Sequence, residues 1–213
     1  MNALLSLYSQ RFDWFLELTW QHLYISGIAI VIATVIGIIA GVFISEYKKA
    51  ARFVLGFCNI VYTVPSISLL GFLLPFSGVG NTTAVIALTV SALLPIIRNT
   101  YTGINEIDAD IIEAAKGMGC TQWQLIGKIK LPLALPVILA GFRNMVVMTV
   151  SLAGIASYIG AGGLGLAIYR GITTNHQVMT VAASLLIALL AIFLDALIGA
   201  GEKHMKRKRR ISS

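Results

Sequence analysis

The most suggestive chemical motif in the sequence is a set of three glycines with the spacing of a dinucleotide-binding loop. Gly160, Gly162 and Gly165 satisfy G-x-G-x-x-G. Such a loop binds a pyrophosphate when it follows a strand, opens an amphipathic helix and has an acidic residue about 20 positions later. Here apolar runs flank the motif, and the segment 183–191 contains no acid. We therefore interpret these glycines as a tight turn or a place of close helix packing.

No catalytic constellation can be identified in the sequence. No G-x-x-x-x-G-K-[ST] segment occurs, so we expect no P-loop for ATP in this chain. The histidines are scattered and suggest no metal ligand set, and neither cysteine has the context of a nucleophile; these residues are His22, His176, His204, Cys58 and Cys120. We predict that the chain is not an enzyme and holds no cofactor or metal.

Two charged residues interrupt otherwise apolar stretches. Arg143 is the only charge between Leu131 and Ala167, and Asp195 follows the uncharged segment 171–194. A charge inside a membrane is costly unless it is paired or hydrated. The sequence leaves three arrangements open: the two residues pair, both face water in a pore, or they snorkel separately.

The composition determines the elements that must position these residues. The chain of 213 residues is 57% hydrophobic and 12% charged, whereas a soluble domain carries about 25% charged residues. A helix needs about 20 apolar residues to cross a bilayer. We predict an all-α integral membrane protein in which residues 1–213 form one domain. About five transmembrane helices are expected, at residues 21–44, 53–76, 82–98, 132–153 and 178–199.

Several flanking features follow from the same pattern. Residues 2–18 mix aromatic and charged side chains, which predicts an interfacial helix on the outer surface. Pro65 should kink the second span, because proline removes a helical hydrogen bond. Arg98, at the end of a short third span, should snorkel to the inner interface. The glycine-rich segment 155–171 is expected outside.

The positive charges predict the orientation. The net charge is +7, and the basic residues gather after the first span, in the central polar segment and in the tail 202–213. Arg11 and Arg170 alone fall in the opposite compartment. The positive-inside rule therefore predicts an outer N-terminus and a cytoplasmic C-terminus. A basic tail beside anionic lipid explains the charge better than a nucleic-acid site.

The polar segment 99–131 carries the strongest local signals. Asp110 and Glu113 have capping-box spacing and predict a short helix over 111–118, which ends at Gly119. Thr121 and Gln124 repeat the box and should open a second helix that runs to Pro132. We expect Gly119 to adopt a left-handed conformation at the bend between them.

The first of these helices presents two small residues. Ala114 and Ala115 should form a flat patch that another protein could approach closely. Physical reasoning from the residues leaves two alternatives open. The segment either docks onto a partner or only connects two spans on the membrane surface.

A resemblance bears on this choice. Glu113-Ala114-Ala115, Gly119, Ile129 and Leu131-Pro132 resemble the EAA signature, E-A-A-x3-G-x9-I-x-L-P, of bacterial ABC importer permeases, with every position matched. The resemblance implies the type I importer permease fold in the bacterial cell membrane. It also implies that residues 99–131 hold a coupling helix inserted into a groove of a separate cytoplasmic ATPase.

Three further segments are similar to the osmoprotectant branch of that family, which serves glycine betaine, carnitine and choline; they are residues 62–66, 94–104 and 159–165. The resemblance implies a second permease chain, identical or paralogous, and an extracellular or periplasmic substrate-binding protein. ATP and Mg²⁺ would be bound by the ATPase partner. Methionine importer permeases are the nearest alternative, and a non-transporting membrane scaffold or a secondary transporter are alternatives of other classes.

Overall fold

The computed structural model describes residues 2 to 210, with side chains from residue 3 to residue 203, and all secondary structure in this part of the chain is helical. In chain order, the elements are α1 (Asn2–Gln10), α2 (Phe12–Glu46), α3 (Lys48–Thr63), α4 (Ser66–Ser77), α5 (Asn81–Asn105), α6 (Ala109–Gly117), α7 (Gln122–Gln124), the π-helix η1 (Leu125–Lys130), α8 (Leu131–Ala153), the 3-10 helix η2 (Ile155–Ile159), α9 (Gly165–Thr173) and α10 (Gln177–Arg210).

Five segments of this described part are suited to crossing a bilayer. Four are continuous helical stretches, namely α2, α5, the rod Gln122–Ala153 and the stretch Gln177–Lys203 of α10. The fifth is the bent pair α3 and α4, counted as one span. The predicted all-α membrane architecture with about five transmembrane helices is confirmed.

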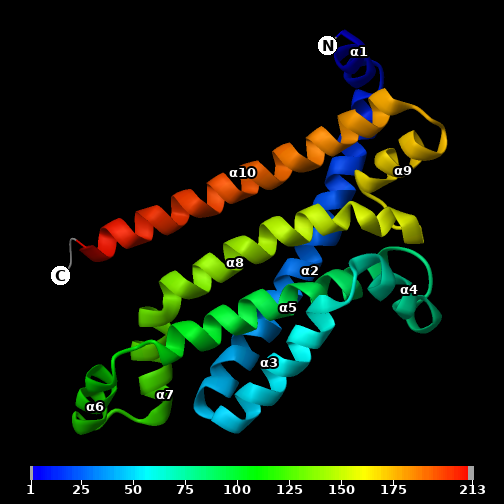
Figure 1. The fold of residues 1–213 in the computed structure, drawn as a ribbon. Coiled ribbons are helices and arrows are strands. Elements are labelled where there is room, and N and C mark those ends of the chain that lie inside the picture. Colours follow the sequence, from blue (N-terminus) through cyan, green and yellow to red (C-terminus); the bar gives the residue numbers. More distant parts are fainter. Residues whose placement is uncertain (1, 211–213) are drawn as a thin grey trace.

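Helix α5 lies at the centre of the bundle, in contact with α2, α3, α4 and α8 (Figure 1). Small residues let α2 approach α5 closely. They recur at every fourth position and so lie on one buried face of α2, at Ala29, Ala33, Gly37 and Gly41. A Cβ atom at Gly37 would lie 2.1 Å from Cγ2 of Ile96. Small residues at helix interfaces are how membrane bundles gain van der Waals contact.

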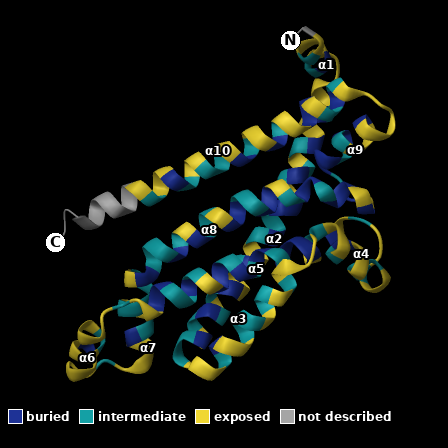
Figure 2. Ribbon diagram, viewed as in Figure 1, coloured by how far each residue is buried: buried dark blue, intermediate teal, exposed yellow. Residues whose placement is uncertain are grey.

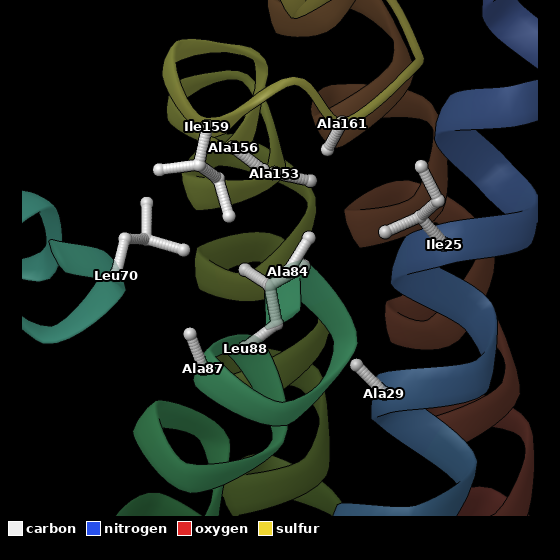
Figure 3. Packing of buried hydrophobic residues seen from close by; sticks show 10 residues of the cluster. All are labelled: Ile25, Ala29, Leu70, Ala84, Ala87, Leu88, Ala153, Ala156, Ile159 and Ala161. Carbon is white, nitrogen blue, oxygen red and sulfur yellow. The ribbon is translucent and has the colours of Figure 1, made fainter. Parts of the chain in front are cut away.

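One core cluster joins α4 and η2 to this bundle. Figure 3 shows Leu70 of α4 and Ile159 of η2 facing side chains of α5, while Ile25 and Ala29 approach from α2. In contrast, exposed residues continue along α10 and α3 (Figure 2), including Phe57 and Phe193. Large exposed apolar side chains on these faces are suited to contact with lipid, or with another membrane chain.

The N-terminal segment differs from the prediction. The expected interfacial helix 2–18 is divided, because α1 ends at Gln10 and residues 12–18 belong to the long helix α2. Arg11, with φ −127° and ψ 32°, forms the break. Leu7 of α1 and Phe15 and Leu18 of α2 pack in a cluster with α9 and α10, so tertiary packing sets this division.

The second predicted span, 53–76, is broken rather than kinked. Helices α3 and α4 meet at an angle of 101°. Val64 is extended, with φ −69° and ψ 126°. Pro65 disfavours the helical conformation at the preceding residue and cannot donate a backbone hydrogen bond, so the helix stops there.

The third span is longer than the predicted 82–98. Helix α5 continues to Asn105, and Thr100, Gly103 and Ile104 are buried on it. Ile104 packs in the core cluster with Ala134 of α8. Helix α5 therefore continues beyond Arg98, the first charged residue after its apolar run.

The glycine-rich segment forms η2, a tight turn and the start of α9 rather than one loop. The N–H group of Gly162 donates to Oδ1 of Asn81 at 2.9 Å, and that of Gly163 donates to Oε1 of Gln21 at 3.2 Å. Gly163 has a φ of +92° and lies against His22. These glycines serve a tight turn and close packing, as predicted, and the two N–H groups are already satisfied within the chain.

The fifth span lies within α10, whose backbone continues to Arg210. Residues 211–213 of the predicted basic tail, and the side chains of residues 204–210, lie outside the described residues. Helices α6 and α7 lie at one end of the bundle, and α4, η2 and α9 lie at the other (Figure 1).

Candidate functional site in the polar loop

Helix α6 begins at a different residue from the one predicted. Its N-cap is Asp108, whose Oδ1 accepts a hydrogen bond from the N–H group of Asp110 at 3.0 Å. The expected box between Asp110 and Glu113 is therefore wrong. Asp108 is two residues nearer to the end of α5 and caps the helix first, which leaves the carboxylate of Glu113 exposed on its surface.

The bend after α6 is a complete Schellman motif. The N–H group of Gly119 donates to the Lys116 carbonyl at 2.9 Å, and that of Cys120 donates to the Ala115 carbonyl at 3.2 Å. Gly119 has a φ of +82°. The predicted left-handed conformation of Gly119 is confirmed.

The second capping box is also confirmed. The Thr121 side chain accepts from the N–H group of Gln124, and the Gln124 side chain accepts from that of Thr121. The helix does not stop at Pro132, however, because α7, η1 and α8 form one continuous rod. Pro132 has no N–H group for a bond to residue 128, and the wider π turn lies directly before it.

The two alanines of the EAA segment lie in different surroundings. Ala114 is exposed, as is Glu113, whereas Ala115 is only 1% exposed. Helix α6 packs against η1, so Ala115 contributes to the internal packing of the loop. The prediction that both alanines form a free patch is wrong for Ala115, because the short loop needs a buried side of its own.

Three large apolar side chains of the loop are exposed. Trp123 is 84% exposed and Met118 is 77% exposed, and Ile111 of α6 is exposed as well. They lie with Glu113 and Ala114 on the same short segment. Sequence reasoning missed these three residues, although an apolar residue in a capped polar loop was a signal that could have identified them.

The last residues of the signature lie away from this surface. Ile129 near the end of η1, and Leu131 and Pro132 at the start of α8, are half-buried. Leu131 packs against the core cluster that contains Ile104. Leu131 therefore packs the start of α8 into the membrane bundle.

A polar contact that the sequence prediction missed ties the loop to α2. Glu46, at the end of α2, pairs with Lys130 through Oε1, and its Oε2 accepts a hydrogen bond from Gln122 at 2.7 Å. Both partners lie in the loop. The available signal was that Glu46 is the single acidic residue between Glu17 and Glu106.

The intramembrane charges are brought together. Arg143 of α8 donates two hydrogen bonds to the carboxylate of Asp195 of α10. Of the arrangements that the sequence left open, the structure has the ion pair. The pair lies far along α8 from the loop and links two spans.

The described residues contain no group of three or more His, Cys, Asp or Glu side chains that could hold a metal ion. The site thus consists of a capped loop, bent at Gly119, with exposed apolar and acidic residues. Its geometry is suited to protein contact at the end of a membrane bundle.

Comparison with known families identifies this arrangement. Residues 33–207 match the family described as "Binding-protein-dependent transport system inner membrane component". The chain belongs to this family. Its members are transport permease subunits, which implies a role in transport across the membrane rather than in catalysis.

Relatives in this family cover nearly the whole chain. The chain is 37% identical to the "Glycine betaine/carnitine/choline transport system permease protein OpuCB" of Bacillus subtilis, over 98% of this chain and 96% of the relative. It is 43% identical to the "Osmoprotectant import permease protein OsmW" of Salmonella typhimurium, over 85% of this chain and 87% of the relative.

A solved structure of a permease supports the fold. The inward-facing MetNI methionine ABC transporter matches with a TM-score of 0.74 and 27% identity, over 92% of this chain and 96% of that one. The chain has the type I ABC importer permease fold predicted from the EAA segment.

Proposed function

We propose that the chain is the pore-forming permease of an ATP-driven importer of osmoprotectant quaternary amines. The relatives named for glycine betaine, carnitine and choline transport, which extend over nearly its full length, carry this proposal. The chain would sit in a bacterial inner membrane with its N-terminus outside and its C-terminus in the cytoplasm.

The polar loop would couple the pore to the ATPase. Glu113 and Ala114, with the exposed apolar residues Met118 and Trp123, would enter a groove of a separate cytoplasmic ATPase subunit. Gly119 would set the angle of this surface, and Ala115 would support it from inside. Ile129, Leu131 and Pro132 would transmit the movement of the loop to α8.

The partners follow from this role. A second permease chain would complete the pore, and an extracellular or periplasmic binding protein would deliver the substrate. ATP and Mg²⁺ would be bound by the ATPase subunits, because no nucleotide motif is present in this sequence. Membrane lipid would cover the remaining apolar faces.

The experiment is purification of the tagged chain from its native membrane, identification of the proteins that accompany it, and uptake of labelled glycine betaine into proteoliposomes. We expect an ATPase and a binding protein to co-purify, and we expect uptake to require ATP. The likeness to the MetNI permease makes methionine the compound to compare. Uptake of methionine but not of glycine betaine would show that the chain belongs with the methionine importer permeases instead.

A further inference from the structure

The break between α3 and α4 leaves backbone groups without partners. Within the described residues, no hydrogen bond reaches the carbonyl oxygens of Tyr62 and Thr63, at the end of α3. No bond leaves the N–H groups of residues 66–68, at the start of α4. These five polar backbone groups at the bend therefore have no hydrogen-bond partner among the described residues.

The length of α3 sets how deep these groups lie when Lys48 is at the inner membrane surface. Helix α3 starts at Lys48 and has 16 residues, so its end is about 24 Å along the axis from its start, whereas the hydrocarbon core is about 30 Å thick. Unsatisfied backbone at that depth occurs where it lines a water-filled cavity or is covered by protein. The bend is thus suited to the translocation path.

Arg98 contacts α3 close to this bend. The exposed guanidinium of Arg98, on α5, donates through Nη2 to Oδ1 of Asn59 at 2.9 Å. This is the only hydrogen bond of the Arg98 side chain among the described residues, and no acidic side chain there pairs with it. The guanidinium therefore binds a neutral amide on the neighbouring helix, a contact that the sequence did not predict.

Asn59 and Tyr62 are three residues apart, so they lie on adjoining parts of one face of α3. Asn59 is about 17 Å along α3 from Lys48, and Arg98 is about 25 Å along α5 from Asn81, so both lie in the half of the bundle towards the polar loop. An intramembrane cation with no counter-ion is a candidate for contact with a substrate anion. Arginine is suited to a carboxylate, because its N–H groups can donate two parallel bonds.

Tyr62 supplies the complementary chemistry. Its side chain is 48% exposed, and its hydroxyl donates to Sδ of Met148 on α8 at 3.3 Å, which restrains the ring. Aromatic rings attract quaternary ammonium groups. The free carbonyls at the end of α3 add the negative end of the helix dipole.

We propose that Arg98 and Tyr62 contact a zwitterionic quaternary amine on its way through the pore. Arg98, held by Asn59, binds the carboxylate, while Tyr62 and the carbonyl end of α3 bind the ammonium group. This inference rests on the proposed function and adds a specificity site to it. Choline carries a hydroxyl in place of the carboxylate, so Arg98 distinguishes the two kinds of substrate.

The test measures uptake of glycine betaine and of choline by the complete transporter in proteoliposomes, with its ATPase and binding protein. Arg98→Gln removes the charge and keeps an amide that can still bond Asn59. We expect this variant to lower betaine uptake about tenfold, as for one lost charge-assisted contact, and to leave choline uptake within about twofold of the wild type.

Two variants of the ring complete the design. Tyr62→Leu should lower uptake of both compounds, whereas Tyr62→Phe should retain most of it, because the ring and not the hydroxyl binds the cation. Phe57→Leu, at an exposed aromatic residue of the same helix, is the matched control and should change neither. Stimulation of the ATPase by loaded binding protein should persist in each variant, which shows that the assembly is intact.

The outcomes separate the two proposals. A wild-type transporter that moves neither compound overturns the proposed function, and this site with it. If the wild type moves both and Arg98→Gln lowers both equally, or neither, the site is overturned alone, because Arg98 then has a structural role or none. Equal loss in Phe57→Leu and Tyr62→Leu would overturn the assignment of Tyr62.

Discussion

Arg143 on α8 and Asp195 on α10 are joined by an ion pair in which Nε and Nη2 each donate to one carboxylate oxygen. Glu202 lies further along α10, with Oε2 at 3.9 Å from Nη1 of Arg143. A Cβ atom at Gly199 would lie 3.0 Å from the guanidinium carbon, so glycine leaves room for the arginine. The pair stabilises the contact of α10 with the bundle.

The first prediction concerns this pair. Arg143→Ala and Asp195→Ala should each lower the temperature at which the purified chain unfolds in lipid nanodiscs, because each breaks the two hydrogen bonds that join the charges, and Glu202 at 3.9 Å replaces Asp195 only in part. The double variant should lose little more than the worse single variant, because the contact between the two residues can be lost only once. Additive losses would show that the two residues act independently.

The second prediction concerns Gly119. Gly119→Val forces a branched residue into a left-handed conformation at a strain of about 1–2 kcal/mol, which should misdirect α7 without affecting insertion of the spans. We expect near-normal membrane levels but loss of uptake and of ATPase stimulation. Gly117→Ala is the control, because Gly117 is the last residue of α6 with open space around it and should tolerate a methyl group. Normal uptake by Gly119→Val would contradict a coupling role for the bend.

The third prediction separates the two alanines. Ala114→Trp adds a bulky ring on an exposed face, so the protein should reach the membrane and yet lose coupled uptake. Ala115→Trp overfills a buried position at a cost of about 1–3 kcal/mol and should lower the amount of folded protein instead. Membrane levels by immunoblot and ATPase stimulation distinguish these effects. Normal coupling in Ala114→Trp would favour the alternative in which the loop is a connector only.

The fourth prediction concerns Glu46 and Lys130. A single charge reversal, Glu46→Lys or Lys130→Glu, should lower uptake about tenfold, since a half-buried hydrogen bond between charged groups contributes about 1.5–3 kcal/mol. Combining both reversals restores opposite charges and should recover much of the activity. If the double variant is as poor as the single ones, the residues do not act through this pair.

The fifth prediction tests orientation. Replacing Cys58 with serine leaves Cys120 as the single thiol, because the chain has two cysteines. A membrane-impermeant maleimide should fail to label Cys120 in intact cells and should label it in inverted vesicles. Labelling from the outside would reverse the proposed topology and remove the loop from the cytoplasm.

The sequence by itself determined the features that depend on neighbouring residues. The long uncharged runs required membrane helices, because only a helix satisfies its own backbone in lipid. The box of Thr121 and Gln124 and the left-handed Gly119 were predictable, because each is a local hydrogen-bond or steric requirement. The choice of Asp110 over Asp108 was wrong because two acids compete for one helix start.

Only the tertiary structure decided which distant residues meet. Arg98 and Asn59 are 39 residues apart, and Glu46 and Lys130 are 84 apart. The long extent of α5 and the burial of Ala115 are likewise set by packing against α8 and η1. Periodicity and charge show that such side chains need partners, but the partner depends on how the helices cross, which a single sequence does not specify.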